Sequence, residues 1–240
     1  MLSAQDLSLP GRLAGVSLAL RPGEVTAICG PNGAGKSSLL TCLAGLAGRG
    51  VALDGTALEA MALRARARVL GYLPQSADVA WDVSVETLVG LGRLPWGDDA
   101  AQDRAAIEAA LAALALEPLR ARPVSQVSGG ERARALLARV LAGSPGWLLA
   151  DEPLANLDLA HQLALLAHFR ALAAGGLGVV LVLHDLAHAM NHADRVVVLD
   201  QGRVVADGAP EQALAQDVIA KVWGVGARWL GEPGQRALAT

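Results

Sequence analysis

The chain has 240 residues, of which 53% are hydrophobic and 18% charged, and its formal net charge is −3. This length is enough for one full-size domain with a sizeable core. The near balance of 20 basic and 23 acidic residues lacks the basic excess typical of nucleic-acid-binding proteins, so we expect no nucleic-acid partner. The densest apolar run, residues 177–183, is far shorter than the ~18 residues that a membrane-spanning helix needs.

The N-terminal segment and the cysteines bear on the compartment. Residues 1–12 have neither the charged start nor the apolar stretch of a signal peptide. Cys29 and Cys42 are too few for a disulfide framework. We therefore expect a reducing, cytosolic environment in which both thiols are buried.

Short β-branched runs alternate with helices rich in alanine and leucine. The sequence predicts strands at 24–29, 69–73, 147–150, 179–183 and 196–199, and helices at 36–46, 103–116, 130–142, 160–173 and 186–193. This alternation indicates an α/β domain with a largely parallel sheet. Residues 77–140 lack strand signals and are expected to form a helical insertion.

A phosphate-binding loop is predicted between the first strand and the first helix. Residues 30–37 fit the pattern G-x-x-x-x-G-K-[ST] at every fixed position. Glycines let successive N–H groups curve around an anion, Lys36 suits the β- and γ-phosphates, and the Ser37 hydroxyl can bind Mg²⁺. Lysine occurs only twice in the chain, so its presence here looks specific. The predicted nucleotide-binding residues are Gly30, Pro31, Asn32, Gly33, Ala34, Gly35, Lys36, Ser37 and Ser38.

Two further segments fit phosphate chemistry. Asp151 and Glu152 follow a buried strand, where Asp151 could hold Mg²⁺ through water and Glu152 could orient or deprotonate an attacking water. The segment Ser128, Gly129, Gly130, Glu131 opens a predicted helix and could bind a second phosphate, although a simple helix cap is the alternative. Two such helix starts in one chain suggest that the second acts on another subunit's nucleotide.

In this order and spacing, the segments resemble those of ATP-binding cassette (ABC) ATPases over about residues 2–225. Residues 30–37 match the Walker A motif, 128–131 the signature and 147–152 the Walker B motif. The resemblance also matches Gln75 with the Q-loop glutamine, Asp158 with the D-loop and His184 with the switch histidine.

The resemblance implies an α/β fold, a P-loop NTPase core with a mainly parallel sheet and an N-terminal antiparallel β part. A helical subdomain of about residues 76–140 is inserted into this core. The ATP-binding domain then spans residues 1–225, and residues 226–240 form a short C-terminal tail. Trp223 and Trp229 are expected to be packing anchors.

The resemblance also implies a head-to-tail homodimer that hydrolyses ATP with Mg²⁺. Each ATP lies between the Walker motifs of one subunit and the signature of the other. Glu152 and His184 are the implied catalytic residues. Gln75 contacts the nucleotide site and links it to a transport partner, and the implied metal ligands are Ser37, Gln75 and Asp151, the last through water.

Residues 81–96 resemble the same segment in ATPases of iron-siderophore, heme and cobalamin importers. This implies a peripheral subunit on the cytoplasmic face of the bacterial inner membrane, with two permease subunits and, indirectly, a periplasmic or lipoprotein substrate-binding protein. Its apolar residues and Arg93 are expected to line a groove for the permease, the alternative being an amphipathic core helix. The alternative function is a soluble single-cassette ATPase of iron–sulfur cluster assembly.

Some positions depart from the family pattern or allow another interpretation. No aromatic residue precedes Tyr72, so the usual adenine-stacking ring is missing and only Arg12, in a loop expected to hold it loosely, could replace it. We therefore expect less than about a tenfold preference for ATP over GTP. The spacing of His184, His188 and His192 could bind zinc, but solvated helix histidines are the preferred interpretation.

Overall fold

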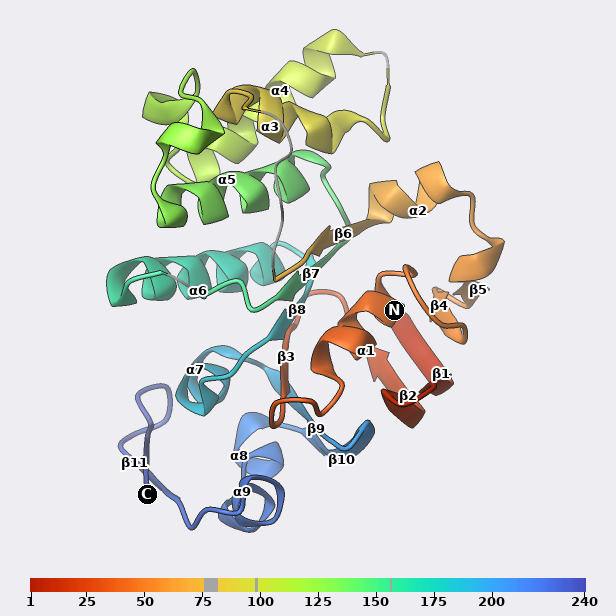
Figure 1. The fold of residues 1–240 in the computed structure, drawn as a ribbon, viewed down its shortest axis with the longest axis vertical. Helices are drawn as coiled ribbons and strands as arrows, with labels where there is room; N and C mark the ends of the chain where they lie inside the picture. The colour runs from red at the N-terminus through yellow and green to blue at the C-terminus, as the bar shows by residue number, and fades with distance from the viewer. Residues whose placement is uncertain (76–81, 98, 156) are drawn as a thin grey trace.

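The computed structural model describes residues 1–75, 82–97, 99–155 and 157–240 and is shown in Figure 1. Within these ranges, a six-stranded sheet has the order β10-β9-β3-β8-β7-β6. Its parallel strands are β6 (Leu70–Leu73), β7 (Trp147–Asp151), β8 (Gly178–Val182), β3 (Val25–Cys29) and β9 (Arg195–Asp200). The edge strand β10 (Arg203–Gly208) runs antiparallel to β9. The predicted α/β class with a mainly parallel sheet is confirmed.

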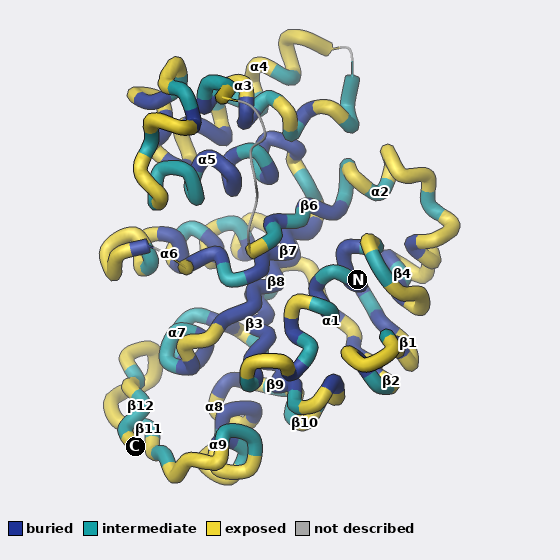
Figure 2. The backbone as a smooth tube through the Cα atoms, in the orientation of Figure 1, coloured by how far each residue is buried: buried dark blue, intermediate teal, exposed yellow. Residues whose placement is uncertain are grey.

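The central sheet is buried on both faces, as its continuous apolar strands require. Along β3, Ala27 and Cys29 face one core and Ile28 faces the other, because successive side chains alternate across a strand. One core lies under α5 (Gly129–Ala142), α6 (Leu159–Ala174) and α7 (Leu186–His192). The other contains α1 (Lys36–Leu43). Figure 2 shows these buried segments converging along the middle of the molecule.

The N-terminal antiparallel part is present as a second sheet, with the order β2-β1-β4-β5. Its strands are β1 (Leu2–Leu9), β2 (Leu13–Leu20), β4 (Val51–Leu53) and β5 (Thr56–Ala57). Helix α1 is packed between this sheet and the central sheet, and its buried leucines join the core of both. The phosphate loop at the start of α1 therefore lies where the two sheets meet.

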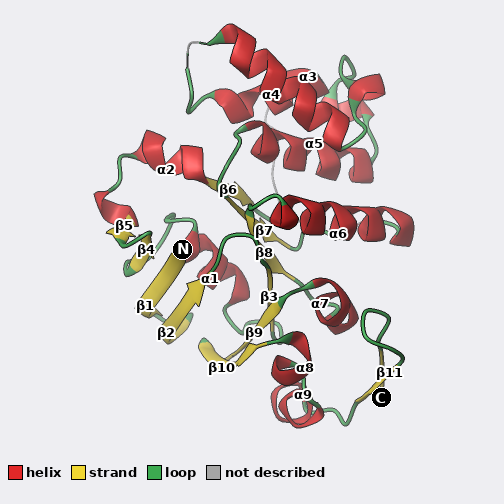
Figure 3. Ribbon diagram, turned by 180° about the vertical axis from the view of Figure 1, so that it is seen from behind, coloured by secondary structure: helices red, strands yellow, loops and turns green. Residues whose placement is uncertain are grey.

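The helical insertion is grouped at one end of the molecule, as Figures 1 and 3 show from opposite sides. It consists of α3 (Val85–Gly90), η2 (Leu91–Arg93), α4 (Ala100–Ala113), η3 (Glu117–Leu119), η4 (Val124–Gln126) and α5. The remaining helices are η1 (Leu58–Ala60), α2 (Leu63–Val69), α8 (Pro210–Ala213) and α9 (Gln216–Trp223). Within the described ranges, none of the helices is long and apolar enough to cross a bilayer.

Helix ends differ from the sequence prediction for local reasons. The helix expected at 103–116 is α4, which begins three residues earlier because the Asp99 carboxylate caps it by accepting hydrogen bonds from the N–H groups of Ala101 and Gln102. The helix expected to reach residue 46 ends at Leu43, ahead of a turn at Gly45, where φ is +69°.

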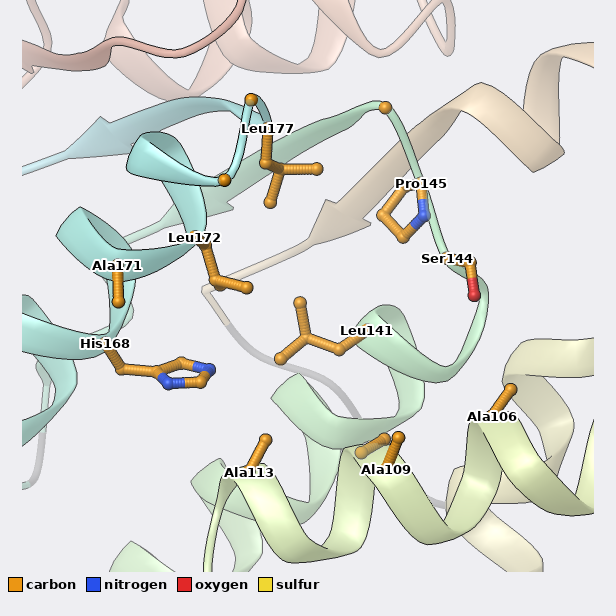
Figure 4. Close-up of a pocket in the computed structure, with 14 residues that line it drawn as sticks. Ala106, Ala109, Ala113, Leu141, Ser144, Pro145, His168, Ala171, Leu172 and Leu177 are labelled. Atoms are coloured by element: carbon orange, nitrogen blue, oxygen red, sulfur yellow. The ribbon is translucent and has the colours of Figure 1, made fainter.

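A cavity of about 570 Å³ lies between α4 and α6 (Figure 4). Alanines 106, 109 and 113 of α4 line one side, and His168 of α6 points into the space from the other. The His168 Nε2 atom is buried and has no hydrogen-bond partner in the part of the chain that the structure describes. Burial lowers the pKa of this imidazole, so it favours the neutral form. The helical insertion and the core are therefore incompletely packed where α4 faces α6.

The expectation that Arg93 lines an exposed groove is wrong. Arg93 is only 8% exposed and forms an ion pair with Asp103 of α4, with Nε 2.6 Å from the carboxylate. Its Nη1 also donates to the Ala142 carbonyl at the end of α5, 3.0 Å away. The guanidinium stacks on Trp96, whose Nε1 donates to the Gly143 carbonyl at 2.8 Å. Arg93 thus joins α4 to the end of α5.

The rest of the segment 81–96 is divided between core and surface. Trp81, its first residue, lies outside the described residues. Val85 and Leu88 are buried in the core of the insertion, as the core-helix alternative expected. Leu91 and Leu94 are 37% and 72% exposed. The segment therefore supplies both a core helix and an exposed apolar edge.

Residues 226–240, expected to be a short tail, contain a β-hairpin of β11 (Arg228–Leu230) and β12 (Ala237–Ala239). The hairpin is tied to α7, because Asn191 donates to the Arg236 carbonyl and accepts from the Arg236 N–H, both at 2.8 Å. Trp229 packs against the core and donates from Nε1 to the Leu214 carbonyl. This contact confirms Trp229 as a packing anchor.

Replacing Arg93 should destabilise the insertion. Arg93→Ala leaves the partly buried Asp103 carboxylate and the Ala142 carbonyl without this cation, which should lower the free energy of unfolding by about 2–3 kcal/mol. Urea denaturation measures this change. The control, Arg49→Ala at an exposed position, should change it by less than about 0.5 kcal/mol. Equal losses in the two variants would contradict the structural role of Arg93.

Candidate nucleotide-binding site

The phosphate loop is curled so tightly that glycine is required at two positions. Gly30 has φ of +150°, and a Cβ there would lie 2.2 Å from the Leu199 carbonyl oxygen. Gly35 has φ of +99°, and a Cβ there would lie 2.7 Å from the Arg12 carbonyl oxygen. Any other residue at either position would push the backbone apart. The loop is therefore held against both β9 and the turn between β1 and β2.

Lys36 is held over the loop by backbone carbonyls. Its Nζ donates to the carbonyls of Gly30 and Pro31, both at 2.9 Å, and the residue is 6% exposed. Burial lowers the pKa of Lys36, while the nearby carboxylates of Glu152 and Asp151 oppose that change. Burial also raises the pKa of Cys29 to about 12, so this thiol is an unreactive core group.

Asp151 ends β7 beside the start of α1 and is 4% exposed. Burial raises the Asp151 pKa, and the neighbouring Ser37 hydroxyl opposes this change. Its Oδ1 is buried and has no hydrogen-bond partner among the described residues. A hard divalent cation such as Mg²⁺ prefers oxygen ligands of this kind, directly or through water. The orphaned carboxylate oxygen and the adjacent hydroxyl therefore fit the predicted metal.

The Glu152 carboxylate lies between the side chains of Gln75 and His184. Its Oε2 accepts a hydrogen bond from Gln75 Nε2 at 2.6 Å, and its Oε1 contacts His184 Nε2. Gln75 follows β6, Glu152 follows β7 and His184 follows β8, so all three project from the carboxyl ends of neighbouring strands. This is the edge at which open parallel sheets bind ligands.

These residues border one cavity of about 630 Å³. Its lining consists of Arg12, Asn32, Gly33, Gly35, Lys36, Ser37, Ser38, Gln75, Glu152 and His184. The cavity thus combines a cationic phosphate loop with a carboxylate held between an amide and an imidazole. Such a site can bind a triphosphate and place a base near its terminal phosphate.

The zinc interpretation of His184, His188 and His192 has no support. Among the described residues, no cluster of three or more His, Cys, Asp or Glu is arranged to bind a metal ion.

Arg12 lines the cavity, but its loop is not loosely held as expected. Its N–H donates to the Leu9 carbonyl at 2.9 Å, and its carbonyl packs closely against the α-carbons of Gly35 and Gly202. Ala14 N–H donates to the Gly202 carbonyl on the other side of the turn. The side chain is exposed at the cavity rim. The backbone of Arg12 is therefore fixed while its guanidinium stays free to approach a bound base.

The signature segment forms a helix cap within its own chain. The Ser128 hydroxyl accepts from the Glu131 N–H, and the Glu131 carboxylate accepts from the Ser128 N–H at 2.7 Å. This capping box lowers the Glu131 pKa and fixes the start of α5. Asp158 caps α6 in a similar way by accepting from the His161 N–H. Ser128, Glu131 and Asp158 are separate from the lining of the nucleotide cavity given above.

Sequence reasoning missed Gln162, on α6, which contacts the segment after Glu152. Its only sequence signal is its position four residues after Asp158, one helical turn beyond the cap. That spacing alone does not distinguish it from a solvated residue on the helix surface.

The buried carboxylate of Asp151 should reduce the stability of the nucleotide-free protein. The folded protein binds the Asp151 proton more tightly than the unfolded chain, whose carboxyl has the ordinary pKa of 3.8. The cost of ionisation is therefore absent below that pKa and complete above the raised folded pKa. Asp151→Asn should raise the Tm by a few degrees at pH 8, and this gain should shrink toward pH 4. Differential scanning calorimetry across this range is the test.

The control for this measurement is Asp217→Asn at an exposed position on α9, which should not raise the Tm at either pH. A lower Tm for Asp151→Asn at pH 8 would show that Lys36 and Ser37 outweigh the cost of burying the charge.

Comparisons with known proteins agree with this site. A family model described as ABC transporter matches residues 13–155. The chain is 45% identical to the Hemin import ATP-binding protein HmuV of Streptomyces coelicolor, with 88% of this chain and 77% of that protein covered. It is 44% identical to the protein of the same name from Myxococcus xanthus, with 93% and 90% covered.

Solved structures show the same fold. The structure of cbiO1 from Clostridium perfringens, part of the ABC transporter complex cbiONQ, has a TM-score of 0.79 and 26% identity, with 92% of each chain covered. An inward-facing putative metal-chelate type ABC transporter has a TM-score of 0.82 at 23% identity, with 99% of this chain and 95% of that chain covered. The phosphate loop, the carboxylate pair and these likenesses lead to one conclusion: the chain belongs to the ABC transporter family and is an ATP-binding subunit that hydrolyses ATP.

Proposed function

We propose that the chain energises the import of hemin across the bacterial inner membrane. Two copies would lie on the cytoplasmic face beneath two permease subunits, and a substrate-binding protein would deliver the cargo. The observation that supports ATP-driven work is Glu152, held between Gln75 and His184 at the mouth of the phosphate loop. Hemin is preferred to an iron-siderophore or cobalamin because relatives at 44–45% identity are named hemin import ATP-binding proteins.

The proposed chemistry is attack of water on the γ-phosphorus of ATP, which releases ADP and phosphate. Lys36 binds the β- and γ-phosphates, and the N–H groups of the curled loop bind the remaining oxygens. Ser37, Asp151 and Gln75 would hold Mg²⁺, which neutralises phosphate charge when bound. Glu152 accepts the proton of the attacking water, and His184 donates a hydrogen bond to the γ-phosphate.

The Gln75–Glu152 hydrogen bond suggests how a partner could control this reaction. Both Glu152 oxygens are engaged by the chain itself, one by Gln75 and one by His184. These two contacts fix the position of the carboxylate, and each oxygen keeps a lone pair that can accept from a water. Residue 75 adjoins the segment that leads into the helical insertion, so movement of the insertion by a permease would shift Gln75 and with it the position of Glu152.

The signature would act on the nucleotide of the second copy. The capping box at Ser128 and Glu131 holds the first N–H groups of α5 in place, and α5 is 14 residues long. A fixed helix start of this length favours an anion at its end. Asp158, also at a helix start, would lie at the same dimer interface. The caps at Ser128 and Asp158 would thus also contribute to the dimer interface, with the geometry that they have in the single chain.

The apolar edge at Leu91 and Leu94 would receive a cytoplasmic helix of the permease. Both leucines are exposed, and Arg93 is buried between them and fixes the short helix η2. A rigid apolar edge loses little conformational entropy when it binds a helix. The role assigned to Arg93 is therefore support of the edge rather than direct contact.

The decisive experiment is to co-purify the chain with its permease and substrate-binding protein and to measure ATPase stimulation by different cargos. Hemin should stimulate hydrolysis, whereas a ferric siderophore and cobalamin should not. Stimulation by either of these instead would overturn the hemin assignment. Isolation with soluble partners alone would favour the iron–sulfur assembly ATPase.

Glu152→Gln should abolish turnover while ATP still binds. The amide can keep the contact with Gln75 or His184 but cannot accept a proton, so kcat should fall at least about a hundredfold. The phosphate contacts remain, so the Kd for ATP measured by calorimetry should change by less than about twofold. Steady-state hydrolysis at the wild-type rate would refute the role of Glu152.

Leu94→Asp should prevent assembly with the permease because it puts a charge into an apolar contact. The basal ATPase activity of the isolated subunit should remain. The matched control is Leu230→Asp, since Leu230 is 45% exposed on the hairpin at the other end of the molecule. Gel filtration of the co-expressed complex compares the two variants, and normal assembly of Leu94→Asp would show that the edge is not the docking site.

A further inference from the structure

The Gln162 side chain joins two segments that follow neighbouring strands. From α6, its Nε2 donates to the carbonyls of Leu154 and Leu157, at 3.3 and 3.1 Å. Its Oε1 lies 3.3 Å from His188 Nε2 on α7. All three polar contacts are partly buried, and the His188 side chain is 15% exposed. Gln162 thus forms a bridge rather than a surface contact.

The chemistry of the partners fixes which atom faces which segment. Backbone carbonyls only accept hydrogen bonds, so the Gln162 amide nitrogen must point to Leu154 and Leu157. The amide oxygen then faces α7 and can only accept. His188 must therefore carry its proton on Nε2 to complete the bridge. The hydrogen bonds therefore all run one way: the imidazole donates to the amide oxygen, and the amide nitrogen donates to the two carbonyls.

The two bridged segments are those that carry Glu152 and His184. Leu154 and Leu157 lie two and five residues after Glu152, and both are buried. His188 lies in the first turn of α7, whose cap Asp185 directly follows His184 and accepts from the N–H groups of Ala187 and His188. The Glu152–His184 contact and the Gln162 bridge are therefore two links between the same pair of strand ends.

The far end of α7 is held as well. Asn191 exchanges two hydrogen bonds with the backbone of Arg236 in the C-terminal hairpin. Helix α7 is thus fixed at its last turn by the hairpin and at its first turn by the bridge. Loss of the bridge would remove the Gln162 link between this first turn and the segment after Glu152, while the hairpin contact at the other end remains.

We infer that Gln162 and His188 are positioning residues for ATP hydrolysis, whose mutual hydrogen bond sets the distance between Glu152 and His184. This inference rests on the roles proposed above for those two residues. Neither Gln162 nor His188 lines the nucleotide cavity described above. A small displacement of reacting groups strongly reduces the rate of a reaction. Loss of the bridge should therefore lower kcat and leave ATP affinity unchanged.

The test is a double-mutant cycle on the purified full chain with Gln162→Leu, His188→Leu and both together. Each single variant should lower kcat about tenfold, with KM for ATP and the Kd from calorimetry changed by less than twofold. The double variant should be no slower than the slower single variant, because each single variant already breaks the Gln162–His188 bond. His188→Gln should keep at least half of the wild-type kcat, because its amide nitrogen can donate to Gln162 Oε1 from the position of the imidazole Nε2.

The matched control is His192→Leu, one turn further along α7, with its ring 6.1 Å from that of His188. Its kcat should remain within twofold of wild type. The inference is overturned if the two single losses multiply to about a hundredfold in the double variant, if Gln162→Leu keeps wild-type kcat, or if His188→Gln is as slow as His188→Leu. Should Gln162→Leu fail to fold, the comparison of His188→Leu with His188→Gln decides.

Glu152→Gln, measured in parallel, separates this inference from the proposed function. Loss of turnover there with normal kcat in Gln162→Leu overturns the bridge alone. Wild-type turnover in Glu152→Gln overturns the role of Glu152 and the bridge with it.

Discussion

The backbone of the phosphate loop lies in direct contact with two other segments, and this contact constrains the rest of the site. At Gly30 the loop touches the Leu199 carbonyl at the end of β9, and at Gly35 it touches the Arg12 carbonyl in the turn of the antiparallel sheet. Gly202 meets the same Arg12 carbonyl. One junction therefore joins both sheets and the start of α1. The nucleotide site lies at this junction, and its shape depends on three positions that exclude a side chain.

The charges at this junction are poorly balanced without a ligand. Burial lowers the pKa of Lys36 and raises that of Asp151, so each group carries its charge at a cost to folding. Lys36 is limited to backbone carbonyls, and one Asp151 oxygen has no partner among the described residues. A triphosphate with the proposed Mg²⁺ would supply partners for both groups. The buried charges thus lower the stability of the free protein and strengthen the binding of a charged ligand, as is common at functional sites.

Features set by local backbone chemistry could be predicted from the sequence, and features set by distant partners could not. The phosphate loop and the strand before Asp151 follow from glycine spacing and apolar runs within ten residues. The burial of Arg93 depends on Asp103 and on the carbonyl of Ala142, and the anchoring of Arg12 depends on Gly202. An arginine with such a distant partner has the same local pattern as an exposed one. The start of α4 was predicted three residues too late. Several acidic residues precede this helix, and the sequence alone does not show that Asp99 is the one that caps it.

Glu152 shows why several contacts converge on the end of β7. Its φ of +51° is unusual for a residue with a side chain and costs about 1–3 kcal/mol. In this conformation the carboxylate contacts both Gln75 and His184. Such strain persists only where the surroundings over-determine the conformation. The Ala155 N–H donates to the Glu152 carbonyl, and Gln162 donates to the carbonyls of Leu154 and Leu157, two and five residues further along the chain. The bridge to α7 therefore stabilises the backbone conformation that aims the proposed base.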